Sequence, residues 1–172
     1  MVVQAEAVAQ QELVGGGQTG LHSHAGGGES EVVVVKVGDT ANATTTLADA
    51  TGLSFTALAN KTYLIEALVR YVTSATTVGI QLSANGPATP GFVAGLWGVN
   101  AAQGTPDGGA FNAWNVTIAA SAAPFTTDNL ARLHCLFRCG TAGGAFIIRF
   151  AAETTGTITV KDGSVLRYRQ VD

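Results

Sequence analysis

The chain has 172 residues, a length that suits one domain with a short appendage. Hydrophobic residues make up 47% of it, enough for a core, whereas charged residues make up only 12%, about half the usual share of about 25%. The net charge of −3 comes without a basic run or a Lys/Arg stripe, and no apolar run approaches a membrane helix, so neither nucleic-acid binding nor a membrane-spanning segment is expected.

The first segment, residues 1–14, mixes apolar and polar residues without a firm period and could form a short helix or an extended arm. It carries acids and no basic n-region, so we expect a protein made in the cytosol and not exported by a signal of its own. A segment like this before a triple glycine is typical of a tether that orders on a partner. Val2, Val3, Leu13 and Val14 are the candidate anchoring residues, and the alternative is a frayed terminus.

A glycine-rich ribbon follows, GGGQTGLHSHAGGG, with His22 and His24 near its middle. In an extended chain, residues i and i+2 project to the same side, so both imidazoles would face one way. One chain offers only two nitrogens, but three chains around an axis would offer six, the number that an octahedral ion accepts. The ribbon therefore predicts one axial transition-metal ion (Fe, Ni or Zn) per trimer. The alternative is two solvated histidines in a linker.

The body begins with EVVVVKV, residues 31–37, whose consecutive valines predict a strand buried on both faces. A second strand is expected around residues 53–55. Over residues 62–72 the apolar positions recur with period two, which predicts a strand with Glu66 and Arg70 on the polar face. The apolar face would carry Tyr63, Ile65, Ala67, Val69 and Tyr71. The next strand would bury Val78, Ile80 and Leu82, and a turn at residues 85–87 would close it.

Residues 90–124 are looser, with predicted strands over 92–99 and 113–120 on either side of a long Gly/Pro loop. Trp97 and Trp114 flank that loop and are candidate contact residues, because a glycine-rich loop between aromatic residues can be a binding loop. The alternative, which we favour, is a loop pinned over the core.

The last third alternates again, with strands over residues 131–138 and 146–150 and then a predicted hairpin around Asp162-Gly163. Cys135 and Cys139 lie four residues apart on one strand, roughly 13 Å, which is too far for a disulfide, so buried free thiols are expected. Arg167 and Arg169 would share one face of the final strand. About eight to ten short strands without a helix predict an all-β, antiparallel β-sandwich or jelly roll.

The stretch TLADATGLSFTALANKTYLIEALVRYVTSATTVGIQLSANGPATP resembles a module of structural proteins of tailed bacteriophages. That module has a TGL-F strand, a Y-----V-Y strand, a T-G----NGP segment and a closing strand of the type ITVKDGSVLRYRQV, so the resemblance covers roughly residues 32–171. GLHSHAGG is similar to the His-x-His motifs of trimeric phage fibres, in which the histidines of three chains hold a metal ion on the axis. The resemblance implies a homotrimeric β-sandwich protein of the virion, with His22 and His24 as the metal ligands.

We therefore predict two parts, an anchoring arm with its ribbon over residues 1–30 and a knob domain over 31–172. The lack of a long repetitive shaft favours a capsid decoration (cement) protein or head spike bound to the major capsid protein, and the alternative is a tail-fibre or tail-tip knob that binds a receptor or carbohydrate. The low charge fits extensive subunit contact and equally a bland surface. Trimer packing would cover open strand edges.

An enzyme is not expected, because the residues for catalysis are sparse and scattered. The three histidines lie at positions 22, 24 and 134, no Ser sits in a nucleophile elbow, and no glycine loop matches a phosphate-binding loop.

Overall fold

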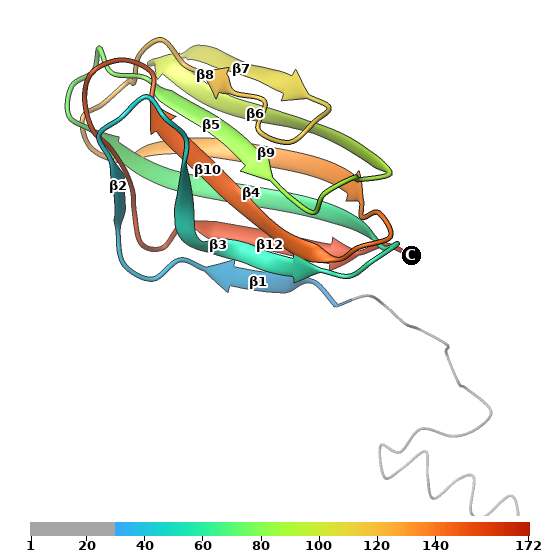
Figure 1. The fold of residues 1–172 in the computed structure, drawn as a ribbon. Helices are drawn as coiled ribbons and strands as arrows, with labels where there is room; N and C mark the ends of the chain where they lie inside the picture. The colour runs from blue at the N-terminus through green and yellow to red at the C-terminus, as the bar shows by residue number, and fades with distance from the viewer. Residues whose placement is uncertain (1–29) are drawn as a thin grey trace, which may run out of the picture.

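The computed structural model describes residues 30–172, which form two stacked antiparallel β-sheets (Figure 1). The predicted antiparallel β-sandwich is confirmed, and the described residues contain no helix. The strands of the larger sheet run in the order β1 (Val32–Val35), β12 (Val165–Gln170), β4 (Thr62–Thr73), β9 (Asn129–Arg138), β6 (Phe92–Ala102) and β7 (Thr105–Phe111). Two short strands complete this sheet: β11 (Ile158–Val160) pairs with β4 on one side and with β2 (Thr40–Asn42) on the other. The smaller sheet has the order β3 (Ala48–Ala57), β10 (Gly144–Ala152), β5 (Ile80–Asn85) and β8 (Ile118–Ala119).

The strand order is that of a jelly roll with one inserted hairpin. Strand β1 pairs with β12 and strand β2 pairs with β11 in one common register. Strands β1 and β2 therefore act as one interrupted strand, and β11 and β12 act as another. If β1 with β2 and β11 with β12 are each counted as one strand, and the β6–β7 hairpin is left out, the described residues contain eight strands. Numbered one to eight along the chain, these strands have the order 1-8-3-6 in the larger sheet and 2-7-4-5 in the smaller sheet. This order gives the two Greek keys of a jelly roll. The inserted hairpin extends the larger sheet past β9.

The core lies between the sheets because alternate side chains of each strand point inward. Strand β4 buries its odd-numbered residues from Tyr63 to Tyr71 and β9 buries its odd-numbered residues, as period two predicted. Phe146, Ile148 and Phe150 of β10 face them and are fully buried. Within this core, the Tyr71 hydroxyl and the Trp97 Nε1 have no hydrogen-bond partner in the described residues.

The valine run occupies an exposed edge, which corrects the prediction that it is buried on both faces. Strand β1 pairs only with β12 and forms the margin of the larger sheet. Val33 is 51% exposed and Val35 is 54% exposed. A run of β-branched residues specifies an extended strand, but it does not specify whether that strand lies at the centre or at the edge of a sheet.

The Asp162-Gly163 turn does not make the predicted hairpin. Strands β11 and β12 both pair with β4, so the chain leaves the strand over residues 161–164 and then rejoins it. Residues 36–39 make a matching excursion in the neighbouring strand. The backbone of Lys36 bonds the excursions together, donating to Ser164 O at 2.8 Å and accepting from Gly163 N at 2.9 Å. Asp162-Gly163 does form a turn, with Gly163 at φ 73°. This turn lies inside one interrupted strand and does not connect two strands that pair with each other.

The predicted Gly/Pro loop of residues 100–112 is largely a strand, and the predicted strand of residues 113–120 is largely a loop. Residues of β7 pair with β6, and only Ile118 and Ala119 of the later segment pair with β5. Pro106 is tolerated in β7 because β7 is an edge strand. Glycine is required at position 108, because a Cβ there would lie 2.2 Å from the Trp97 carbonyl oxygen, and it leaves room at position 109 for the Ile118 side chain.

Candidate functional site

Most of the site residues predicted from the sequence lie outside the described residues. These are His22 and His24, proposed as metal ligands, and the four candidate anchoring residues Val2, Val3, Leu13 and Val14. The division of the chain near residue 30 stays a prediction for the same reason. The metal and anchoring predictions therefore rest on the sequence alone.

The two tryptophans do not form a shared contact loop. Trp97 lies in the middle of β6 and is 1% exposed, so its ring belongs to the core. Trp114 is half-buried, donates from Nε1 to Pro87 O at 2.9 Å, and meets Phe137 edge to face at a centroid distance of 5.1 Å. A Cβ on Gly86 would lie 2.4 Å from the Trp114 ring, so only glycine fits there. Trp114 thus pins its segment over the core, which is the alternative that we favoured from the sequence.

The free surface with the most distinctive chemistry is the outward side of β12, β4, β9 and β6, which we call the outer face. Strand alternation places these side chains in rows across the sheet, and one row joins Arg167, Glu66, His134 and Leu96. Large apolar side chains stand exposed on the outer face at 38–51% of their surface, where soluble strands usually carry polar residues. They are Leu68, Leu96, Leu130, Leu136 and Phe92.

The charges of the outer face are mostly positive. Arg132, Arg138, Arg167 and Arg169 point outward, against one carboxylate within the face, Glu66. In the described residues Arg132, Arg138 and Arg169 make no ion pair, and Arg167 approaches only Glu31, with 3.9 Å between Nη1 and Oε1.

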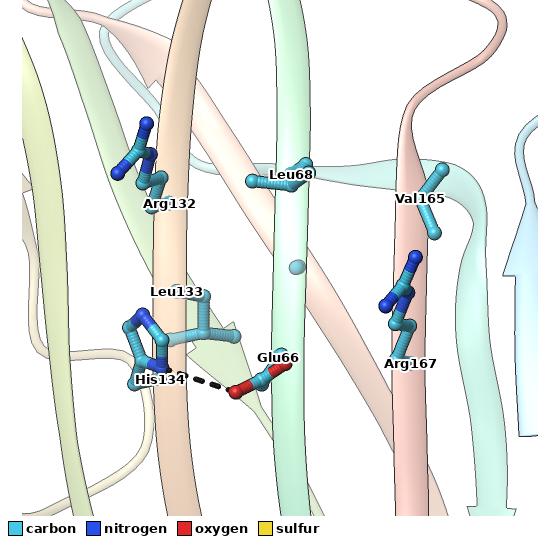
Figure 2. Close-up of a pocket in the computed structure, with 8 residues that line it drawn as sticks. Glu66, Leu68, Arg132, Leu133, His134, Val165 and Arg167 are labelled. Carbon is cyan, nitrogen blue, oxygen red and sulfur yellow. Dashed lines mark ion pairs between the residues drawn. The ribbon is translucent and has the colours of Figure 1, made fainter. Parts of the chain in front are cut away.

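A shallow depression of about 130 Å³ lies at the centre of the outer face (Figure 2). Figure 2 shows Arg132 and His134 on one strand, Leu68 and Glu66 on the next, and Arg167 beyond them. The His134 Nδ1 lies 3.6 Å from the Glu66 Oε1, with both side chains about half exposed. The depression offers cationic hydrogen-bond donors around an apolar floor, which suits a carboxylate with an apolar neighbour.

The outer face lacks the parts of a catalytic site. His134 and Glu66 are adjacent, but no Ser, Thr or Cys nucleophile lines the depression with them. No group of three or more His, Cys, Asp and Glu residues that could hold a metal occurs among residues 30–172. Cys135 and Cys139 are buried free thiols, as predicted, and burial raises the pKa of Cys135 to about 12.

A second charged cluster joins the two excursions and is explained by structure. Lys36 is 2% exposed and its Nζ donates to Thr40 Oγ1 and Thr51 O, both at 2.7 Å. Burial lowers the pKa of the Lys36 ammonium, an effect that the carboxylates of Asp39 and Asp162 oppose. Asp39 also accepts hydrogen bonds from the Lys161 ammonium and the Asp162 backbone N–H. These bonds hold the excursions against one another, so the cluster needs no ligand.

The outer face was not recognised from the sequence because it requires the register of four strands. The available signal was a break in alternation, since Leu64 and Leu68 in β4 and Leu130 and Leu136 in β9 occupy positions where a polar residue was expected. Read one strand at a time, each leucine is unremarkable on a protein surface. Only their alignment across β4, β9 and β6 makes a patch.

The part of the chain that the structure describes contains no helix long and apolar enough to cross a bilayer. No protein-family model and no curated protein matches the chain.

Among solved structures, one match is the structure of the infectious bursal disease virus Gt strain, with 10% identity over 84% of this chain and 38% of that chain, at a TM-score of 0.26. Another is the crystal structure of the infectious bursal disease virus VP2 subviral particle, with 6% identity over 83% of this chain and 37% of that chain, at a TM-score of 0.24. The chain spans less than two-fifths of the length of these structures. Both TM-scores are too low to carry an argument about fold or function.

Proposed function

We propose that this chain is a structural protein of a tailed-phage virion, a trimeric capsid decoration protein or head spike anchored by Val2, Val3, Leu13 and Val14. The observation that carries the proposal is the resemblance over roughly residues 32–171, whose motif residues form β3, β4 and the interrupted strand of β11 and β12. Jelly rolls occur in capsid proteins, lectins and cupins, so the fold by itself does not choose among them.

The interior of the sandwich favours a structural role over a ligand-binding one. Aromatic and aliphatic side chains fill the space between the sheets, and the buried polar residues of the described part carry hydrogen bonds that tie strands together. His134 is the one histidine in the described residues, and it lies on the outer face, so the interior has no imidazole for a cupin-like metal site. The lectin-like alternative loses Trp97 as a contact residue, since the core covers its ring.

Association in threes is the physical premise of the proposal. Strand β1 leaves an apolar margin open on the larger sheet, and open margins of this kind are covered in stable proteins. Light scattering on the full chain tests the premise. We expect the mass of a trimer, and a monomer at micromolar concentration would contradict the proposal.

The position on the particle is tested by imaging the intact virion and counting copies. A decoration protein or spike on the capsid should be present in hundreds of copies per virion. A handful of copies at the tail would instead favour the receptor-binding alternative, and glycan or cell adsorption by the isolated protein would do the same.

The metal proposal is tested by replacing both ribbon histidines. His22→Ala with His24→Ala should abolish bound Fe, Ni or Zn and lower the melting temperature of the full chain. In the unaltered protein, metal affinity should fall below about pH 6, because protonation of the imidazoles competes with the ion. An unchanged metal content by elemental analysis of the double variant would exclude these ligands.

A further inference from the structure

We propose that residues 2–14 of this chain dock on the outer face of the larger sheet when the protein is not attached to a partner. The inference concerns the isolated protein and does not require the virion assignment. It gives the apolar residues of that segment a covered position before they meet a partner surface. Three independent observations support it: the chemistry of the outer face, the composition of the segment, and the place where the chain enters the sheet.

The outer face has the two properties that an acidic, apolar segment requires. Its exposed leucines lie diagonally on adjacent strands, Leu96 of β6 next to Leu136 of β9 and Leu68 of β4 next to Leu130 of β9, with the Arg132 and His134 side chains between the two pairs. Arg132 stands beside Leu68 in the cross-strand register, and no described acid pairs with it. A segment that alternates aliphatic and carboxylate side chains would satisfy both groups together.

The segment before the described residues has the complementary composition. Residues 1–29 contain three acids, Glu6, Glu12 and Glu29, and no Lys or Arg, so all nine Lys and Arg residues of the protein lie in the described part. Around Glu6 and Glu12, residues 2–14 supply Val, Ala and Leu side chains. A second outer face is a poorer occupant, because its excess of arginines would repel an identical surface.

The chain enters the sheet beside the outer face. Residue 31 precedes β1 directly, and β1 pairs with β12, so the preceding residues start at the margin of the same sheet. The carboxylate of Glu31 already approaches Arg167 of the outer face, at 3.9 Å. From β1 to β9 is three strand spacings, about 14 Å. The 16 residues from 15 to 30 have the contour length to cover this distance, because a Gly-rich segment of that length has a mean end-to-end distance of roughly 22 Å. Glu12 and Leu13 can therefore reach the leucines of β4 and β9.

Paramagnetic relaxation on the full chain tests the inference. A nitroxide is attached at an introduced Ala9→Cys thiol, which is selective because both native cysteines are buried. We expect stronger broadening of the backbone amides of Glu66, His134 and Leu96 than of amides in β3 and β10, which lie about 10 Å farther from the label in the opposed sheet, each measured against a diamagnetic control label. Uniform or absent broadening would overturn the inference.

Charge reversal separates docking from proximity. Glu6→Lys with Glu12→Lys should reduce the ratio of docked to free segment roughly tenfold at low salt, since two favourable ion contacts become repulsive. Adding Arg132→Glu and Arg167→Glu should restore the broadening, whereas broadening that ignores both changes would overturn the role of charge. Glu29→Lys is the matched control outside the docking segment and should have no effect.

A mixed sample shows whether the segment docks on its own chain or on a neighbouring chain. It combines one chain that carries the nitroxide but no ¹⁵N with another chain that carries ¹⁵N but no nitroxide. Broadening in the mixture means that the segment docks on a neighbouring chain, whereas broadening in the spin-labelled ¹⁵N protein with none in the mixture means that it docks on its own chain. Docking without particle binding would leave this inference standing while the proposed function fails, so the two are separable.

Discussion

Removing the hydroxyl of Tyr71 should stabilise the protein. The side chain is 0% exposed, and its hydroxyl has no hydrogen-bond partner among the described residues. A hydroxyl buried without a partner costs about 1–3 kcal/mol, and Tyr71→Phe removes that one oxygen while it keeps the ring. We therefore expect the free energy of unfolding to rise by about 1–2 kcal/mol at pH 7. For a chain of this length that corresponds to roughly 2–8 °C in Tm.

Tyr63→Phe is the matched control, because it makes the same chemical change on the same face of the same strand, eight residues before Tyr71. Tyr63 is 3% exposed, but its hydroxyl accepts a hydrogen bond of 2.9 Å from the backbone N–H of Leu58. Removing that acceptor should lower the free energy of unfolding by about 1 kcal/mol. The two substitutions should thus have opposite signs.

The pH dependence gives a second measure of the same group. Burial raises the pKa of Tyr71 to about 12, from 10.0 in the unfolded chain. As the pH rises, the unfolded state loses the phenolic proton first, so this group costs stability between about pH 10 and pH 12. By pH 11 the cost is about 1.4 kcal/mol. Tyr71→Phe lacks it, so the advantage of the variant should widen with pH.

Urea unfolding followed by tryptophan fluorescence measures both variants, at one fixed protein concentration because association makes stability depend on concentration. If Tyr71→Phe proves no more stable than the unaltered protein while Tyr63→Phe is destabilised, the hydroxyl has a partner, such as a buried water. The argument from an unpaired buried group would then be wrong.

Three further predictions follow from single positions. Gly79→Ala would place a Cβ 1.6 Å from a backbone carbonyl oxygen and should lower the free energy of unfolding by about 3 kcal/mol or more, whereas Gly98→Ala meets nothing within 4 Å and should cost less than about 1 kcal/mol in the same thermal melt. The thiols of Cys135 and Cys139 should resist a thiol reagent at pH 8 until urea unfolds the chain, and rapid native reaction would contradict their burial. Hydrogen bonds hold the pKa of Asp39 below its usual range, so Asp39→Asn should lower Tm at pH 6 by an amount that vanishes as the pH falls below that pKa; a constant difference would refute the contribution of charge.

The sequence allowed prediction of the strands that form the centre of the fold, because burial there leaves a period of two. Strands β4, β9 and β10 lie where alternation placed them, and Cys135 is buried as expected. In such strands one face must be apolar, so the pattern and the structure have the same cause.

Position within a sheet was not predictable, because it depends on partners far away in the chain. The valines of β1 look like a central strand, yet nothing beyond β12 pairs with them in the described residues. The Asp162-Gly163 turn has the chemistry of a hairpin, and only the matching excursion at residues 36–39 shows that the strand resumes on the same partner. Local rules fix a turn, whereas topology decides what it connects.

The candidate site was the least predictable part. Trp97 attracted attention as an aromatic residue next to a glycine-rich segment, but it fills the core. Leu96, its neighbour, is 51% exposed and belongs to the outer face. One residue of strand register separates the two roles, and a sequence pattern with apolar residues on both faces cannot fix that register.

The position of β4 has a consequence for how the protein is made. It is translated early, yet its partners begin much later in the chain, β9 on one side at Asn129 and β11 with β12 on the other side at Ile158. The ribosome, at about 5–20 residues per second, needs several seconds between β4 and β9. During that interval β4, one face of which is apolar along its length, has no paired strand on either side. Strand β12 is the last to join the sheet, so we expect the body to fold only once β12 has left the exit tunnel, slowly and all at once, as long-range pairings require.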